Sequence, residues 1–172
     1  LAGKTLTIIG HGELGQGVAQ VGKAFGMQVC IAERQGQTPR KGRTEFNQAL
    51  QDADVVSIHC PLTADTEHLI NKQTLAMMKP SAVVVNTARG PVINEQDLAD
   101  ALHNGVIAGA ALDVLSTEPP AADNPLIKYE GDNLLLTPHT AWASSQARDR
   151  LIAQIALNIT AFVNGETRNL VS

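Results

Sequence analysis

Residues 5–15 read TLTIIGHGELG, an apolar run that leads directly into a glycine-rich turn. The turn, Gly10-His11-Gly12-Glu13-Leu14-Gly15, fits the pattern G-x-G-x-x-G, and apolar residues at helical spacing follow it. In that pattern the first glycine permits a tight turn, the second lets the backbone approach a pyrophosphate, and the third lets a helix pack closely on the strand. The sequence therefore predicts a dinucleotide-binding turn in which the free N–H groups of Glu13 and Leu14 face phosphate.

An acidic residue stands at the end of the next predicted strand, where a dinucleotide-binding fold needs one. Glu33 lies eighteen residues after Gly15. A carboxylate at this place can accept hydrogen bonds from both ribose hydroxyls of adenosine, and its charge repels a 2'-phosphate. We therefore expect NAD rather than NADP as the cofactor. Arg34 leaves this preference open, because a guanidinium beside Glu33 could stack on adenine or bind a 2'-phosphate.

Composition narrows the possible partners. The chain has 172 residues, 44% of them hydrophobic, a net charge of -4 and no Lys/Arg-rich run. These values argue against binding to nucleic acid or to an anionic membrane, and no apolar stretch reaches the roughly 18–20 residues of a membrane span. We expect a soluble, cytoplasmic protein with a small-molecule ligand. Cys30 and Cys60 lie in or next to apolar strand-like runs, which favours buried reduced thiols, and the sequence offers no metal site.

The order of the predicted elements favours an α/β Rossmann fold, a doubly wound parallel sheet of about six strands with helices on both faces. Short β-branched runs alternate with stretches of helical period, and connections of this length imply right-handed crossovers. We expect the strand order 3-2-1-4-5-6. The predicted strands are residues 5–9, 28–32, 54–58, 82–86, 107–112 and 134–137.

Helices are predicted from apolar spacing and from capping residues. The first ends at Gly26, a short one follows Asn71, and a third runs from the cap Asn94 to Gly105. The last runs from about residue 144 to 163 and is closed by Gly165. The apolar stripe of the first helix is Leu14, Val18, Val21 and Phe25, and the expected buried face of the last is Leu151, Ile155, Ile159 and Phe162.

Three polar residues of complementary chemistry follow three different predicted strands: Arg89, Glu118 and His139. Taken singly, each could be a solvated loop charge, a turn residue or a helix-start residue. Because the carboxyl ends of parallel strands share one edge of the sheet, the three loops can open onto the crevice that holds the dinucleotide. There an imidazole can deliver a proton, a carboxylate can hold the imidazole, and a guanidinium can bind a carboxylate in two hydrogen bonds. Together they predict carbonyl reduction beside a nicotinamide.

Motifs along nearly the whole chain resemble those of the D-isomer-specific 2-hydroxyacid dehydrogenases. Besides the glycine turn, these are His59-Cys60-Pro61-Leu62-Thr63, Asn86-Thr87-Ala88-Arg89-Gly90, Ala111-Leu112-Asp113-Val114 through Glu118-Pro119, and Pro138-His139-Thr140-Ala141-Trp142. The resemblance implies that Arg89 binds the substrate carboxylate, His139 is the acid/base, and Glu118 pairs with His139. It also implies that the cofactor is contacted by Gly10, Gly12, Glu13, Leu14, Gly15, Glu33, Pro61, Thr66, Thr87, Ala88, Arg89, Asp113 and His139.

The resemblance also bears on the substrate and on the size of the protein. Trp142 is similar to its counterpart in the glycerate dehydrogenase and hydroxypyruvate or glyoxylate reductase branch, although it could equally be a packing or subunit-interface aromatic. We expect a small D-2-hydroxyacid or 2-keto acid substrate and a homodimer. We expect residues 1–164 to form the NAD-binding domain, and residues 165–172 to form a tail toward a substrate domain absent from this chain. The isolated domain would then bind NAD but turn over poorly.

Two hypotheses from other classes remain at the level of the sequence. The first is an NAD(H)-sensing, corepressor-like binding protein in which a similar triad is retained but idle. The second is a Rossmann interaction domain without any affinity for NAD. Turnover of a keto acid would separate the enzyme from the sensor, and binding of NADH would separate both from the interaction domain.

Overall fold

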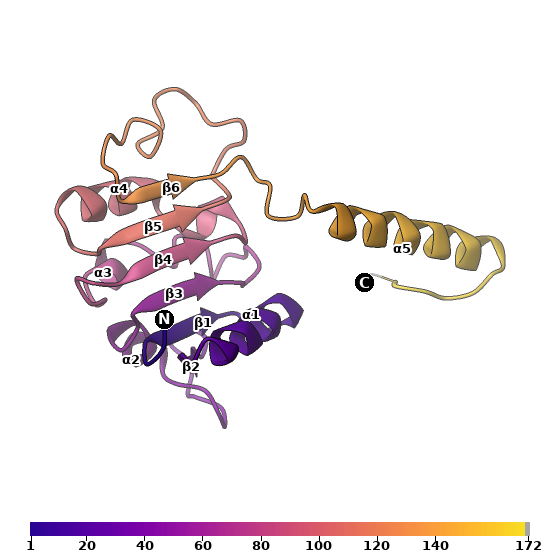
Figure 1. The fold of residues 1–172 in the computed structure, drawn as a ribbon, viewed down its shortest axis with the longest axis horizontal. Coiled ribbons are helices and arrows are strands. Elements are labelled where there is room, and N and C mark those ends of the chain that lie inside the picture. Colours follow the sequence, from indigo (N-terminus) through magenta and orange to yellow (C-terminus); the bar gives the residue numbers. More distant parts are fainter. Residues whose placement is uncertain (171–172) are drawn as a thin grey trace. The chain divides into compact units, whose positions relative to one another are not determined.

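The computed structural model describes residues 1–170 and divides into two compact units, Leu1–Pro138 and a second that begins at His139. The first unit is built on a six-stranded parallel sheet (Figure 1). Its strands are β1 (Thr5–Ile9), β2 (Gln28–Ile31), β3 (Val55–Ile58), β4 (Val83–Asn86), β5 (Gly109–Leu112) and β6 (Leu134–Leu136). Its helices are α1 (Glu13–Ala24), α2 (Phe46–Gln51), α3 (Lys72–Leu75) and α4 (Glu95–His103), with a 3-10 turn, η1, at Gly90–Val92. The predicted Rossmann-like class and all six predicted strands are confirmed.

The strand order is β2-β1-β3-β4-β5-β6, so the predicted order 3-2-1-4-5-6 is wrong. A single residue, Thr44, lies beside the carboxyl end of β2 and forms a parallel bridge with Ala32. Its N–H donates to the carbonyl of Ile31 at 2.9 Å. β3 pairs with the side of β1 opposite to β2, so the winding of the chain reverses between β1 and β3. Ligands of open α/β sheets bind at such a reversal, outside the carboxyl ends of the strands.

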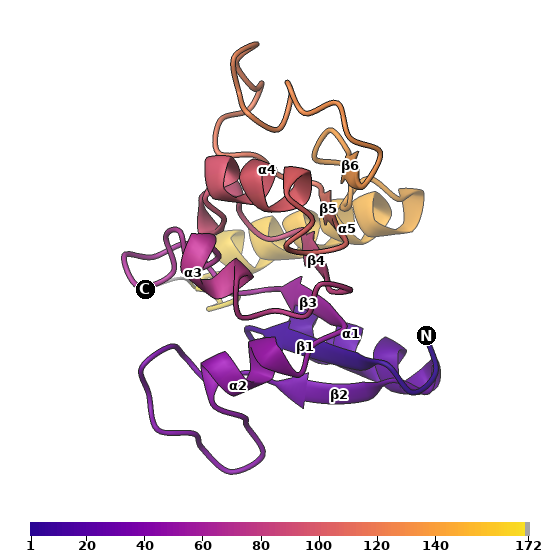
Figure 2. The ribbon, with the colours of Figure 1, turned by 90° about the vertical axis from the view of Figure 1, so that its left-hand side faces the viewer.

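Helices cover both faces of the sheet, as predicted. Figure 2 shows α2, α3 and α4 on one face and α1 on the other. The larger core lies under the three helices, where Phe46, Leu50 and Leu98 pack with Val56 and Val84 of the strands. All five side chains are fully buried. Burial of parallel strands on both faces accounts for their continuous run of branched apolar residues.

The face of α1 that packs on the sheet differs from the apolar stripe of the sequence. Leu14, Val21 and Phe25 are 75%, 56% and 59% exposed, and Val18 is half-buried. The buried residues of the helix are instead Gly15, Ala19 and Gly22. A Cβ atom on Gly22 would lie 2.5 Å from Cδ2 of Leu6, so a residue without a side chain lets α1 approach β1 this closely. Small residues therefore set the position of the helix N-terminus over the sheet edge.

Five of the six strands, β1, β3, β4, β5 and β6, end in one row across the sheet. Ile9 pairs with Ile58, Ile58 with Asn86, Asn86 with Leu112, and Leu112 with Leu136. The residues that directly follow this row share the carboxyl edge of the sheet. They are Gly10, His59, Thr87, Asp113 and Thr137.

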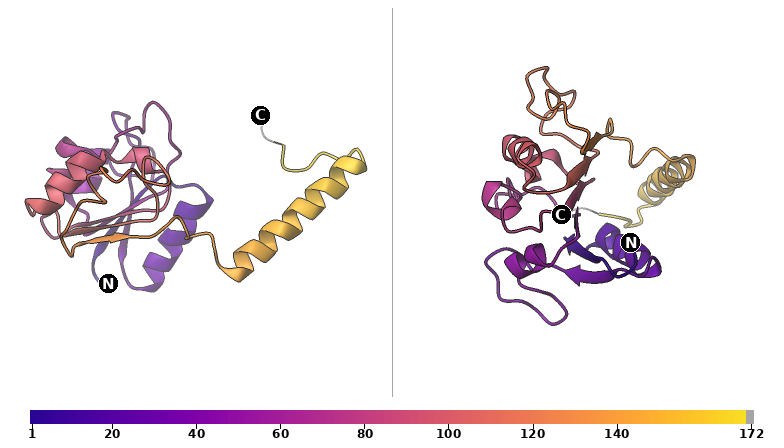
Figure 3. Two further views of the ribbon diagram at one scale, coloured as in Figure 1. Left: turned by 90° about the horizontal axis from the view of Figure 1, so that it is seen from above. Right: turned by 60° about the vertical axis from the view of Figure 1, so that its left-hand side comes forward.

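The second unit holds one long helix, α5 (Ser145–Val163), which runs without interruption (Figure 3). Ser144 caps it by accepting a hydrogen bond from the N–H of Ala147 at 3.2 Å, and Gly165 follows it with a φ of 73°, so both predicted ends are confirmed. The predicted buried face is wrong. Leu151, Ile155, Ile159 and Phe162 are between 49% and 85% exposed. The described part of this unit contains no second helix or strand that could cover them.

The remaining expectations about organisation have mixed outcomes. The domain over residues 1–164 and the tail over 165–172 stay predictions, and residues 171–172 lie outside the described residues. Both cysteines are free thiols, but Cys30 is half-buried whereas Cys60 is buried. Over residues 1–170, no helix is long and apolar enough to cross a membrane, and no three His, Cys, Asp or Glu side chains gather as metal ligands do.

Candidate active site

The glycine turn after β1 is held in a shape that only glycine permits. Gly10 has a φ of 92°, and a Cβ atom on it would lie 2.5 Å from the backbone nitrogen of Cys60. A Cβ atom on Gly15 would collide with the carbonyl oxygen of Gly10. These two glycines therefore join β1, the end of β3 and the first turn of α1 at the point where the winding reverses.

Gly12 has a different role, because space rather than close packing surrounds it. A Cβ atom on Gly12 would meet no atom within 4 Å in the described structure. Gly12 is also the N-cap of α1 and provides no side-chain hydrogen bond to the first turn. The N–H groups of Glu13 and Leu14 thus stand at an uncapped helix N-terminus beside open space, which fits a pyrophosphate.

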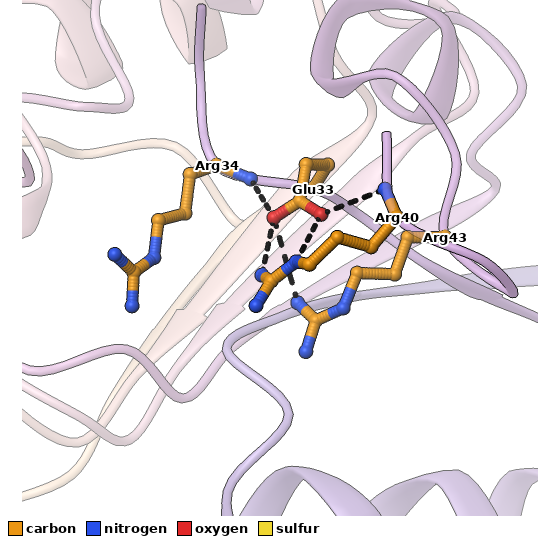
Figure 4. A network of polar contacts seen from close by, with 4 residues as sticks. All are labelled: Glu33, Arg34, Arg40 and Arg43. Atoms are coloured by element: carbon orange, nitrogen blue, oxygen red, sulfur yellow. Dashed lines mark hydrogen bonds and ion pairs between the residues drawn. The ribbon is translucent and has the colours of Figure 1, made fainter. Parts of the chain in front are cut away.

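Glu33 directly follows the bridge at Ala32, at the same edge of the sheet, and is buried among arginines (Figure 4). Arg40 binds it through Nε–H to Oε2 at 2.6 Å and through Nη2–H to Oε1. The backbone N–H groups of Arg34 and Arg40 donate to Oε1 at 2.9 Å and to Oε2 at 3.1 Å. The side chain of Arg40 and these N–H groups hold the pKa of Glu33 well below its ordinary value of 4.5, although burial acts to raise it.

The turn that carries Arg89 is shaped by the buried side chain of Asn86. Its Oδ1 accepts from the N–H of Ala88 at 2.9 Å, and its Nδ2–H donates to the carbonyl of Arg89 at 3.0 Å. Thr87 and Arg89 are exposed. The guanidinium of Arg89 donates one hydrogen bond, from Nη1 to the carbonyl of Ala88 at 2.7 Å. The predicted substrate-binding arginine therefore stands exposed, just beyond the carboxyl edge of the sheet.

Two further predicted cofactor positions are fixed by short local contacts. Asp113, which is buried, receives a hydrogen bond from the hydroxyl of Thr137 at the end of β6. The hydroxyl of Thr66 donates to the carbonyl of Pro61 at 2.7 Å and accepts from the N–H of Thr63 at 2.8 Å. Asp113 belongs to the row at the carboxyl edge, and the segment from Pro61 to Thr66 begins three residues after β3.

The loop that carries Glu118 is anchored by an acidic residue that the sequence analysis did not single out. Glu95, at the start of α4, accepts from the N–H and the hydroxyl of Ser116, both at 2.7 Å, and from Nδ2 of Asn124 at 2.8 Å. Oε1 of Glu118 accepts from the N–H of Leu115 at 3.0 Å. The same loop touches the arginine turn, because a Cβ atom on Gly90 would collide with the backbone of Leu115.

His139 belongs to the second unit, so its place relative to Arg89 and Glu118 stays a prediction. Its own backbone is unusual, with a φ of 52° in the left-handed region that non-glycine residues rarely adopt. Nε1–H of Trp142 donates to the carbonyl of His139 at 2.7 Å. The indole therefore braces the backbone of the predicted acid/base.

Comparison with known proteins assigns the chain to a family. A family model described as "D-isomer specific 2-hydroxyacid dehydrogenase, NAD binding domain" matches residues 1–141. The chain belongs to this family. It is 42% identical over 171 residues to a glycerate dehydrogenase of Methylorubrum extorquens, and 39% identical over 176 residues to a hydroxypyruvate reductase of Blautia hydrogenotrophica. These matches cover 99% and 100% of the chain but 54% of each relative, so the chain spans about half the length of the curated relatives it matches.

A solved member of the family has the same fold. The NAD complex of a D-isomer specific 2-hydroxyacid dehydrogenase from Lactobacillus delbrueckii ssp. bulgaricus superposes with a TM-score of 0.85 at 28% identity. The superposition covers 96% of this chain and 55% of that chain. The family, the fold and NAD as cofactor are thereby confirmed. Because the relatives are dehydrogenases and reductases, the comparisons favour an enzyme over an NAD(H) sensor.

Proposed function

We propose that the protein containing this chain transfers a hydride between NAD(H) and a small D-2-hydroxyacid/2-keto acid pair, such as glycerate/hydroxypyruvate or glycolate/glyoxylate. The observation that carries the proposal is the common strand-end row. It sets the glycine turn, Asp113 and the turn of Arg89 at one edge of the sheet, beside the reversal of winding. When bound, NAD(H) supplies or accepts the hydride.

The residues of this chain divide the remaining work. Arg89 binds the substrate carboxylate and orients the reacting carbonyl, because a guanidinium has five N–H donors in a planar fork and this one uses a single donor within residues 1–170. His139 gives a proton to the substrate oxygen during reduction and takes it back during oxidation. Glu118 pairs with His139 and stabilises its protonated form. Trp142 keeps the backbone of His139 in place.

The test is steady-state kinetics on the full-length protein with NADH and a panel of glyoxylate, hydroxypyruvate and pyruvate, followed by chiral analysis of the product. We expect turnover on the order of 1–10³ per second with one or more of these acids and a D-configured product where the product is chiral. Tight binding of NADH with negligible turnover on the panel would support the sensor instead, and an L-configured product would contradict the proposal.

We also propose that the protein is a cytoplasmic homodimer. Support comes from the family assignment and from the large apolar side chains left exposed on α1 and α5, among them Val21 and Phe162. Light scattering on the full-length protein at micromolar concentration should give twice the mass of one chain. A single-chain mass over the whole concentration range would contradict the dimer.

A further inference from the structure

Glu95 holds the loop of Glu118 near both of its ends. The loop runs over residues 115–124, between β5 and β6. Near its start, Ser116 donates its N–H to Oε1 of Glu95 and its hydroxyl to Oε2, both at 2.7 Å. At its end, Nδ2 of Asn124 donates to Oε2 at 2.8 Å. One carboxylate on α4 therefore closes the loop, and Glu118 lies inside it.

The far end of the loop is fixed to the core of the first unit. Asn124 is buried, and its Oδ1 accepts from the N–H of Leu126 at 2.9 Å. Leu126 belongs to the larger core and is fully buried. Within the loop, Oε1 of Glu118 accepts from the N–H of Leu115 at 3.0 Å. The loop therefore has little freedom to move while Glu95 accepts its hydrogen bonds.

The stretch of chain that carries Glu95 also carries Arg89. The 3-10 turn Gly90–Val92 directly follows Arg89, and α4 begins at Glu95. The N–H of Ile93 donates to the carbonyl of Gly90 at 3.0 Å, so the segment between Arg89 and Glu95 is tightly turned. In the proposed mechanism, one end of this segment binds the substrate, while its other end binds the loop of Glu118.

The segment and the loop also meet at a second point. A Cβ atom on Gly90 would collide with the carbonyl group of Leu115 and with the backbone nitrogen of Ser116. Gly90 is buried at this contact. The loop is thus held by Gly90 at Leu115 and by Glu95 at Ser116. A single contact would leave the loop free to pivot, whereas two contacts on adjacent residues fix its direction relative to the turn of Arg89.

We propose that Glu95 and Gly90 join the turn of Arg89 and the loop over residues 115–124 into one rigid unit, so that binding of the substrate carboxylate and placement of Glu118 depend on each other. Glu95 is then a positioning residue for both groups. Contiguous packed and hydrogen-bonded groups of this kind carry coupling between sites. The inference rests on the proposed function, since it concerns the same site. It adds a dependence between Arg89 and Glu118 that their separate places in the sequence do not indicate.

The first test is the steady-state kinetics of Glu95→Gln in the full-length protein, with NADH and a keto acid. We expect kcat to fall and KM for the keto acid to rise, each by about threefold, because the loop and the turn both lose hydrogen-bonded support. Asp100→Asn is the matched control and should match the wild type, because Asp100 is an exposed acid of α4 that bonds to Gln96 of the same helix. A fall of kcat at unchanged KM would overturn the coupling, because loosening of the loop alone, or loss of folded protein, has that signature.

A double-mutant cycle tests whether Glu95 acts on binding through Arg89. In the Arg89→Gln background we expect Glu95→Gln to lower kcat but to leave KM unchanged, because the guanidinium that it helps to position is absent. Effects of independent residues multiply to within about twofold. A rise of KM by about threefold in both backgrounds would therefore overturn the proposal, since Glu95 would then affect binding without Arg89.

Hydrogen exchange tests the rigid unit without turnover. Ser116→Ala removes the hydroxyl that donates to Glu95, and exchange at the N–H of Ile93, on the other segment, should become about threefold faster. Ser116→Thr keeps a hydroxyl at this exposed position and should match the wild type. Unchanged exchange at Ile93 in Ser116→Ala would overturn the joining of the two segments. The expected exchange pattern in a protein without turnover would uphold the unit and refute the hydride-transfer proposal, so the two failures are distinguishable.

Discussion

Arg89 stands on a turn whose shape is set by its neighbour Asn86 and not by its own side chain. The buried amide of Asn86 bonds to the backbone of Ala88 and of Arg89, so the backbone that carries the guanidinium is held at the sheet edge. At the scale of the residue, binding and positioning are therefore separate tasks. The first falls to exposed side chains and the second to buried polar ones.

Removing the binding group should affect the substrate and spare the cofactor. We expect Arg89→Gln to raise KM for the keto acid by at least about tenfold, since a bidentate carboxylate contact is lost, with the dissociation constant of NADH within about twofold of the wild type. Arg150→Gln, an exposed arginine on α5, is the control. An unchanged KM in full-length Arg89→Gln would show that another residue binds the carboxylate.

Removing a positioning group should have a different signature. Glu95 accepts three hydrogen bonds from the loop of Glu118, and a glutamine can accept at only one of its two terminal atoms. We expect Glu95→Gln to lower kcat/KM by about tenfold, at unchanged NADH affinity, and to speed hydrogen exchange at the N–H of Ser116. Glu130→Gln, an exposed acid without a side-chain contact in the described structure, is the control. Slow exchange at Ser116 in the variant would contradict the anchoring role.

At the scale of the element, α1 is positioned by two residues that have no side chain. Gly15 and Gly22 remove side chains where the helix meets the β1 turn and β1 itself, and this contact puts the uncapped N-terminus of α1 over the sheet edge. Gly17, in the same helix, faces open space. A side chain would therefore collide with the backbone at position 15 but would fit at position 17, only two residues away.

The pair Gly15→Ala and Gly17→Ala tests this contrast. Gly15→Ala should destabilise the protein by roughly 1–3 kcal/mol through overpacking and abolish NADH binding at micromolar concentrations. Gly17→Ala should stabilise it by about 0.5–1 kcal/mol, because alanine loses less backbone freedom in a helix, and should leave NADH binding intact. Urea unfolding and fluorescence titration measure the two effects. Equal stability of the two variants would argue against the close approach.

Comparison of the predicted helices and strands with the observed ones shows which features the sequence could predict. All six strands and the capped ends at Asn94 and Ser144 were predictable, because β-branched runs and caps act locally. The strand order was not, because the sequence of a strand does not indicate on which side of β1 it will pair. Helix α2 has six residues, too few to show a period. Helical spacing identified the apolar stripes of α1 and α5, but it could not indicate which surface each helix would meet.

The candidate site was predictable in its positions and less so in its contacts. The strand-end row brings together Gly10, Thr87 and Asp113, as the order of the motifs implies. The partner of Glu33 escaped prediction because Arg40 lies in a loop without periodicity, seven residues away. A buried acid followed by a loop rich in arginine is the signal that could have indicated it. The meeting of His139 with Arg89 and Glu118 stays a prediction.

At the scale of the whole molecule, acidic side chains with lowered pKa values connect segments far apart in the chain. Glu33 binds Arg40, which lies in the loop over residues 34–43. Asp54 accepts from the N–H of Thr5 at 2.8 Å and forms an ion pair with Lys79. The hydrogen bond from the backbone N–H of Thr5 holds the pKa of Asp54 below its ordinary value of 3.8, and the ammonium group of Lys79 lowers it further. Both groups are ionised in the folded protein at pH values where they would be protonated in the unfolded chain.

This difference fixes the sign of the pH dependence. Below about pH 5 the unfolded chain binds more protons than the folded one, so the free energy of unfolding should fall as the pH decreases from 5 toward 2. The Glu33→Gln variant should be less stable than the wild type at pH 7. Its free energy of unfolding should fall less steeply as the pH decreases, because a glutamine binds no proton when the chain unfolds. Denaturant unfolding at pH 7, 5, 4 and 3 measures how the free energy of unfolding depends on pH in the wild type and in the variant. Parallel curves for the two proteins would mean that Glu33 titrates normally in the fold.

The ion pair between Glu33 and Arg40 fastens the loop over residues 34–43 to the body of the domain. Exposed loop tips are ordinary sites of proteolytic cleavage. While the pair is intact, a protease should therefore cut this loop slowly.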